Sequence, residues 1–168
     1  MLGVNLLFAG FALTLNGISY FVEMDRKAKG VANILVGLVI AINAIFQTSA
    51  ANDHITFGFS AAMWLFALNY FIIGAHIFVK ADNWKVFGLY ALFASVVSLI
   101  FTMDTLINIG SWEMIYMWIM WTLLWAQSFF AVMLGIKAVD KITPHILILN
   151  GIASTFTPGV LILLGIIL

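Results

Sequence analysis

The chain has 168 residues, of which 64% are hydrophobic and 8% are charged, and its mean hydropathy is +1.14. A soluble domain is about half apolar and about a quarter charged, so this composition indicates an integral membrane protein. Seven Lys and Arg residues balance seven Asp and Glu residues, which excludes a basic surface for nucleic acid. The absence of cysteine excludes disulfides, thiolate nucleophiles and cysteine-ligated metal sites.

Charges and turn residues divide the chain into six apolar segments. Each is near the length of about 20 residues that a helix needs to cross the hydrocarbon core of a bilayer. We predict transmembrane helices at residues 2–22, 30–50, 57–79, 84–102, 112–136 and 143–167. The first segment has no basic residue before it, so we expect a retained span and not a signal peptide.

All seven basic residues fall in or directly beside the first, third and fifth connections between these segments. They are Arg26, Lys27, Lys29, Lys80, Lys85, Lys137 and Lys141. The positive-inside rule predicts that these odd-numbered loops are cytoplasmic and that both termini lie outside. Because the basic turns recur at nearly equal spacing, we predict one domain, residues 1–168, of three consecutive helical hairpins.

Polar side chains inside the spans are amides, hydroxyls and aromatics, and no Asp, Glu, Lys or Arg lies well inside. Proton-coupled carriers and ion-selective pores usually need an ionisable group at depth, so a neutral solute is favoured. Helical spacing places some of these polar and aromatic side chains together with apolar ones on three helix faces. The faces are Leu2, Leu6, Ala9, Leu13 and Asn16; Phe59, Met63, Phe66 and Tyr70; and Met114, Trp118, Trp121, Trp125 and Ser128. For any single polar residue, an interhelical hydrogen bond is the simpler interpretation.

Trp121 and Trp125 fall in the middle of their span. An indole N–H that faced lipid would lack a partner, so we expect both rings to point inward, toward a lumen or into a packed core. Gly3, Gly10 and Gly17 form a neighbouring stripe on the first span, which indicates close helix packing.

The last span begins with Thr143-Pro144, a plausible cap followed by proline at the first helical position. Its interior contains Asn150-Gly151 and then Pro158, which has no N–H for the carbonyl of residue 154. We therefore predict an irregular helix with Asn150 beside a solute pathway, although a simple buried kink also fits.

Four stretches of the chain resemble the AmiS/UreI family of urea and short-chain amide channels. They are MLGVNLLFAGFALTLNGI, FALNY at 66–70, SWEMIYMWIMWTLLW ending at 125, and ITP at 142–144. The resemblance implies an all-α integral membrane protein whose six helices form three hairpins around a solute path. It also implies a homohexamer in the bacterial plasma (inner) membrane that passes urea or small aliphatic amides passively to a cytosolic urease or amidase. No cofactor is expected.

The resemblance assigns the path to nine residues: Leu6, Ala9, Leu13, Asn16, Phe66, Tyr70, Trp118, Trp121 and Trp125. The irregular last span adds Asn150 as a tenth path residue. Asn150 stands where the urea channel of acid-tolerant bacteria has a glutamate. This replacement favours aliphatic amides as the solute. The exterior loops carry few titratable groups, and His54 alone is a weak candidate for pH sensing. We therefore expect no strong acid gating.

Three other classes of protein compete with a channel. An intramembrane enzyme would need a nucleophile or base that the spans do not offer, so we expect no catalytic residue. His76 and His145 are the only pair that suits an axially ligated haem, but single histidines at span ends are usually interfacial. A non-transporting membrane scaffold is the third alternative. No metal site is expected.

Overall fold

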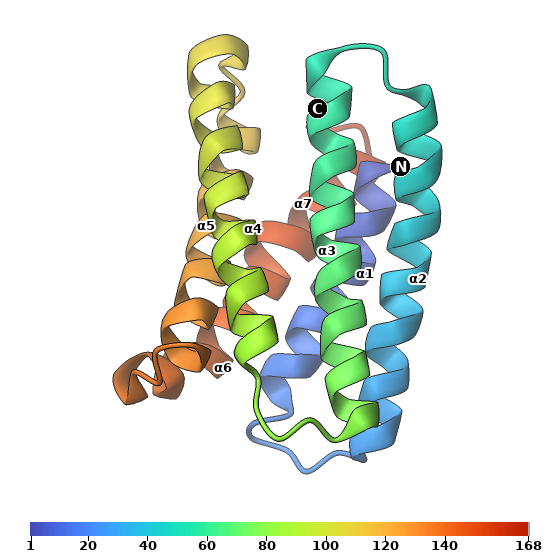
Figure 1. The fold of residues 1–168 in the computed structure, drawn as a ribbon. Helices are drawn as coiled ribbons and strands as arrows, with labels where there is room; N and C mark the ends of the chain where they lie inside the picture. The colour runs from blue at the N-terminus through green and yellow to red at the C-terminus, as the bar shows by residue number, and fades with distance from the viewer. Residues whose placement is uncertain (168) are drawn as a thin grey trace.

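The computed structural model describes residues 1–167, all of them helical or in short connections between helices (Figure 1). The helices are α1 (Leu2–Ile18), α2 (Arg26–Ala50), α3 (His54–Val79), α4 (Lys85–Asp104), α5 (Trp112–Val132), α6 (Lys137–Leu149) and α7 (Thr157–Leu163). Two π-helical segments, η1 (Thr105–Ile109) and η2 (Asn150–Phe156), continue α4 and join α6 to α7. Five stretches of this described chain are long and apolar enough to cross a membrane, and α1 is a shorter apolar helix of 17 residues.

The starts of α2, α3 and α5 are capped by short polar side chains that accept hydrogen bonds from free backbone N–H groups. Asp25 accepts from the amide of Ala28 at the start of α2, and Ser111 accepts from Met114 at the start of α5. Asp53 and Thr56 form a reciprocal capping box at the start of α3. The six predicted segments therefore match the observed helices, with boundaries that differ by a few residues.

The predicted start of the last helix at Thr143 is wrong, because α6 already begins at Lys137. The chain turns at Gly135, which has φ +65°, and resumes a helix directly afterwards. Pro144 then lies inside α6, where it costs one backbone hydrogen bond to the carbonyl of Asp140. Thr143 is not a cap; its hydroxyl donates to Gln127 of α5 at 2.8 Å.

The predicted irregularity of the last helix takes the form of a widened turn and not a break. Seven residues, Asn150–Phe156, are π-helical and run directly into α7, with Pro158 in its first turn. The hydroxyl of Ser154 donates to the carbonyl of Asn150, and that of Thr155 lies 2.6 Å from the carbonyl of Gly151. These hydroxyls satisfy carbonyls that the wide turn leaves exposed, which permits such a segment within a membrane.

The most extensive helix packing is α2 on α3, α4 on α5, and α1 on the segments α6, η2 and α7 (Figure 1). Helices joined by the basic loops pack less extensively, although the sequence predicts hairpins at those loops. The pairing of α1 with the last segments follows from the glycine stripe. A Cβ atom at Gly10 would lie 2.7 Å from the carbonyl oxygen of Gly151, so the two backbones are in contact there.

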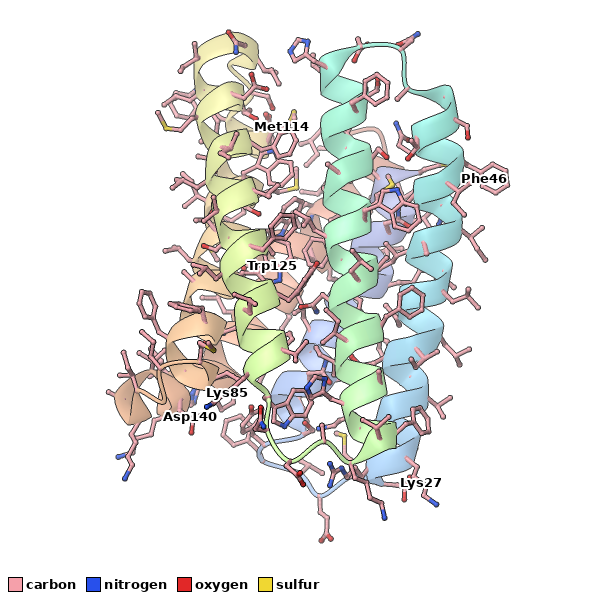
Figure 2. All side chains as sticks on the ribbon, viewed as in Figure 1. Lys27, Phe46, Lys85, Met114, Trp125 and Asp140 are labelled. Carbon is pink, nitrogen blue, oxygen red and sulfur yellow. The ribbon has the colours of Figure 1, made fainter. Side chains whose placement is uncertain are left out.

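The two ends of the bundle differ in charge. The basic end carries Lys27, Lys85 and Asp140, at the bottom of the view in Figure 2. The other, acidic end carries Asp53 and Glu113, near the starts of α3 and α5, and no Lys or Arg. The basic side chains predicted to share one side of a membrane therefore lie at one end of the fold.

Candidate functional site: a cavity closed by aromatic side chains

A cavity of about 480 Å³ occupies the half of the bundle nearer the basic end. It extends from the mouth, near Asp140, to Trp125, which lies midway along the bundle (Figure 2). Its walls come from α1, α2, α3, α4, α5 and α6, and they comprise Leu13, Asn16, Ser19, Tyr20, Lys29, Asn69, Ile73, Trp84, Phe87, Leu124, Trp125, Ser128, Ala131, Val132, Asp140, Thr143 and Leu147. The size is ordinary for a small-molecule site, and the walls are mainly apolar with a few polar groups.

Asn16 and Asn69 contribute neutral amides to the cavity wall. Asn16 of α1 and Asn33 of α2 exchange two side-chain hydrogen bonds, of 2.8 and 3.1 Å. Asn33 also donates to the carbonyl of Lys29 at 2.9 Å. Both amide groups are thereby held in fixed orientations, and Asn16 faces the cavity without a net charge.

Asn69 and Trp125 form a second polar contact at the deep end of the cavity. The indole Nε1–H of Trp125 donates to Asn69 Oδ1 at 3.3 Å, and both side chains are buried. Trp125 therefore points inward with a polar partner, as the sequence predicts. Beside it, Ser128 accepts a hydrogen bond from the amide of Gln127 at 2.7 Å and donates to the carbonyl of Leu124 at 3.0 Å.

A cluster of four aromatic side chains closes the deep end. The ring of Phe66 lies 5.0 Å from that of Trp125, 5.1 Å from that of Trp121 and 6.3 Å from that of Tyr70, between ring centroids. The hydroxyl of Tyr70 donates to the backbone carbonyl of Ala9 at 2.7 Å, which ties α3 to α1. Edge-to-face and offset contacts of this kind hold the rings in defined positions.

Two small voids, each of about 10 Å³, lie beyond the cluster toward the acidic end. The first is lined by Leu2, Asn5, Leu6, Ile40, Ala62, Met63, Phe66 and Trp121, and the second by Leu2, Phe59, Ala62, Met114, Met117, Trp118 and Trp121. Each is about the size that holds one water molecule. The cavity and the voids therefore lie on opposite sides of the aromatic cluster.

Seven of the ten predicted path residues line the cavity or the voids. Leu13, Asn16 and Trp125 line the cavity, while Leu6, Phe66, Trp118 and Trp121 line the voids. Ala9 and Tyr70 are buried between them and are joined by their hydrogen bond.

Asn150 lies outside the cavity and the voids. Its amide nitrogen donates to the carbonyl of Ile146 at 3.2 Å, and its Oδ1 accepts from Ser154 at 2.9 Å. Both polar atoms of the side chain are therefore used within its own helix. His54 is exposed at the first residue of α3, at the acidic end.

Sequence reasoning did not assign Asn69, Ser128, Lys29 and Asp140 to the cavity wall. Lys29 precedes Asn33 by four residues, and this spacing already indicates that both occupy one face of a helix. The ammonium group of Lys29 donates to the hydroxyl of Ser19 at 3.1 Å. The mouth therefore carries one cationic and one anionic side chain.

The two histidines considered for haem have separate aromatic partners. His76 stacks on Trp84 with ring centroids 4.7 Å apart, and His145 meets Phe21 edge-on at 5.3 Å. Among residues 1–167 the structure contains no group of three or more His, Cys, Asp or Glu side chains placed to hold a metal ion. Trp84, the partner of His76, also lines the cavity.

The helices and the aromatic-lined cavity define a multi-pass membrane protein of the channel or transporter class. Residues 1–166 match the AmiS/UreI family of transporters, and the chain belongs to this family. Members of the family are channels and transporters and not enzymes. The resemblance seen in the sequence is confirmed.

Two relatives and two solved structures resemble the chain over most of its length. The acid-activated urea channel of Helicobacter pylori strain J99 is 28% identical over 188 residues, which covers 95% of both chains. A protein of Mycolicibacterium smegmatis named for the transport of amidate substrates is 20% identical over 166 residues, or 97% of this chain and 76% of that one. The electron cryomicroscopy structure of the H. pylori urea channel in a closed state has a TM-score of 0.85 at 24% identity, covering 98% of each chain. Its crystal structure has a TM-score of 0.82 at 23% identity over all of both chains, so the fold is that of a urea channel.

Proposed function

We propose that the protein is a passive channel for urea and small aliphatic amides in the bacterial plasma membrane. Six spans, arranged as three hairpins, surround the path, and the solute supplies a cytosolic urease or amidase. The observation that carries the proposal is a mainly apolar cavity that contains the neutral amides of Asn16 and Asn69, an aromatic cluster at its deep end and two small voids beyond, in a member of a family of transporters.

The proposed orientation places the basic end in the cytoplasm and both termini outside. It is supported by Lys27 and Lys85, which lie at one end of the bundle (Figure 2), and by the positions of the other five basic residues at or near the ends of α2, α3 and α6 that the odd-numbered loops join. The cavity then opens to the cytoplasm, and the small voids lie on the exterior side. α1 serves as the sixth span, since 17 residues are at the short end of the range for a crossing helix.

Selection for neutral, planar solutes follows from the walls. Flat rings of Phe66, Trp121 and Trp125 sandwich the solute, while Asn16 and Asn69 exchange hydrogen bonds with its carbonyl and amide groups. An ion would lose its hydration shell at the aromatic closure with no buried charge to replace it. Lys29 and Asp140 stand only at the mouth, and their opposite charges favour neither cations nor anions.

The protein is proposed to assemble as a homohexamer. Large apolar side chains are exposed along α2 and α4, including Leu35, Ile42, Leu89, Phe93 and Ile100. Contiguous apolar surface of this kind is covered by lipid or by neighbouring protomers. Asn150 uses its polar atoms for hydrogen bonds within its own helix. Its proposed role is to stabilise the wide turn that packs on α1.

Stopped-flow uptake into proteoliposomes tests the proposed function. Urea and acetamide are expected to cross proteoliposome membranes faster than those of empty liposomes, both inward and outward. The rates should not depend on a proton gradient, and sodium and chloride should be excluded. The ratio of the two rates ranks the solutes. Uptake at the rate of empty liposomes, from protein shown to be folded, would favour a non-transporting scaffold.

Uptake is expected to change less than threefold between pH 7.5 and pH 5. The titratable side chains of the acidic end are Asp53, His54, Asp104 and Glu113. Hydrogen bonds from the backbone and hydroxyl of Thr56 lower the pKa of Asp53, so this carboxylate remains charged at both pH values. His54 is a single exposed side chain at the first residue of α3, and it lines neither the cavity nor the voids. A several-fold rise of the urea rate at pH 5 would contradict this expectation.

A further inference from the structure

Two hydroxyl side chains of the cavity wall share one amide partner. Ser128 of α5 and Thr143 of α6 both line the cavity, and they are 6% and 7% exposed. Part of the cavity surface is polar, whereas the surface of the two small voids is apolar. The side chain of Gln127 is also buried, lines neither the cavity nor the voids, and lies within hydrogen-bond distance of both hydroxyls.

The amide group of Gln127 has one orientation that satisfies its neighbours. Its nitrogen lies 3.0 Å from the carbonyl oxygen of Leu124 and 2.7 Å from Oγ of Ser128. Because a carbonyl oxygen only accepts hydrogen bonds, the nitrogen of the amide, and not its oxygen, must face Leu124. Ser128 therefore accepts a hydrogen bond from Gln127, and the amide oxygen is left to accept from Thr143 at 2.8 Å.

Each of the two hydroxyls has already used its single hydrogen. A hydroxyl has one hydrogen to donate and two lone pairs that accept. Ser128 donates to the carbonyl of Leu124 at 3.0 Å, which leaves one lone pair after the bond from Gln127. Thr143 donates either to Gln127 or to the carbonyl of Val139 at 3.1 Å, and in both cases it keeps two lone pairs. Both hydroxyls thus have lone pairs, but no hydrogen, left for a bound molecule.

The two hydroxyls lie next to the aromatic closure. Ser128 follows Trp125 by three residues, so it lies about 4.5 Å further along the axis of α5 toward the basic end. Thr143 is held beside it, because both hydroxyls bond the same amide. A solute that enters the closure from the cavity loses water from its amino groups at this level, which is costly unless other acceptors replace that water.

We propose that Ser128 and Thr143 form an acceptor pair for the amino groups of the permeating solute, with Gln127 as a positioning residue. The proposal rests on the channel function above and adds a specificity-determining site to it. Urea and acetamide have nearly the same planar shape, but urea has two amino groups where acetamide has one amino and one methyl group. Urea can bond both hydroxyls as it enters the closure, and acetamide only one. The pair therefore favours urea, since a methyl group leaves one acceptor without a partner.

Stopped-flow uptake of urea and acetamide tests the acceptor pair, with the rate of empty liposomes subtracted from each. Ser128→Ala and Thr143→Val each remove one acceptor, which costs urea a hydrogen bond that acetamide can still make with the other hydroxyl. The urea-to-acetamide ratio is expected to fall about two- to tenfold in each variant, as for loss of one hydrogen bond. Gln127→Met keeps both hydroxyls but frees them to rotate, so the ratio is expected to fall there as well.

Thr122→Val is the matched control on α5. The hydroxyl of Thr122 donates to the carbonyl of Trp118 at 2.8 Å, and Thr143 can donate in the same way to the residue four positions before it. Thr122 lines neither the cavity nor the voids. This variant is expected to keep the wild-type ratio, and thermal unfolding shows that each variant is folded.

Each outcome has a definite meaning. A wild-type ratio in a folded Ser128→Ala or Thr143→Val protein overturns the acceptor pair and leaves the channel intact, and either variant decides alone if the other does not fold. Equal slowing of both solutes also overturns the pair, because that result reports a change in the width of the path. A wild-type ratio in folded Gln127→Met overturns the positioning role. A wild-type protein that passes neither solute overturns the channel function itself, and with it the pair.

Discussion

Phe66→Ala is expected to raise the rate of glycerol uptake relative to urea by about tenfold or more. The Phe66 ring contacts Trp121 and Trp125 and stands between the cavity and the first void. Its removal joins these spaces, so a bulkier, non-planar solute passes where only a flat one fits. A fall in the barrier of about 1.4 kcal/mol is enough for a tenfold change in rate. Stopped-flow uptake of both solutes measures the ratio.

Phe101→Ala provides the control for that variant. Phe101 also stacks on a tryptophan, Trp118, at 4.8 Å between ring centroids, but it lines neither void. Both substitutions remove a packed phenylalanine, which typically costs about 3–5 kcal/mol of stability when the ring is fully buried. Phe101→Ala could raise glycerol uptake relative to urea as much as Phe66→Ala does. That result would show that general loosening of the bundle, and not loss of the Phe66 ring from the closure, explains the effect.

Gly10→Ala is expected to lower the apparent unfolding temperature of the purified protein in detergent by several degrees or to prevent folding. A Cβ atom at this position would lie 2.7 Å from the carbonyl oxygen of Gly151 and 2.8 Å from the amide nitrogen of Phe156. Both are backbone atoms, so α1 and the wide turn of η2 must move apart. Overpacking of this kind costs about 1–3 kcal/mol and sometimes more. Thermal unfolding followed by size-exclusion chromatography measures the loss.

Gly58→Ala is the matched control in α3. Its Cβ would meet only ring atoms of Phe101, the nearest at 3.2 Å, and a side chain can adjust by a few tenths of an ångström. This variant is expected to unfold near the wild-type temperature. Similar losses in both variants would mean that helix flexibility and not the contact of α1 with η2 sets the stability.

The close contact of α1 with η2 also explains why the last segment is not a regular α-helix. Gly10 and Gly151 approach through their backbones, and the π-helical turn places the hydroxyls of Ser154 and Thr155 on the carbonyls of Asn150 and Gly151. The side chain of Asn150 is drawn into the same network by its bond to Ser154. Asn150, which was expected to lie beside the solute pathway, is thus hydrogen-bonded within its own helix.

The sequence alone determined the class of protein, the number of apolar segments and the end at which the charges gather. These features depend on the hydrophobicity and charge of successive residues, which determine the segments that enter a bilayer and the side on which each loop lies. Helical spacing also placed Leu13, Phe66, Trp121 and Trp125 on the faces that line the cavity or the first void, because the helix period fixes which residues share a face.

Only the tertiary structure decided which polar groups face the path and which are already satisfied. Asn5, Asn16, Asn69 and Asn150 are alike in the sequence, yet each has a different set of hydrogen-bond partners. Which amide keeps a free N–H depends on the neighbouring helix and its exact rotation, and local spacing does not encode this. The start of α6 before Pro144 and the pairing of α1 with the last helix have the same origin, since contacts distant in sequence outweighed the local signals.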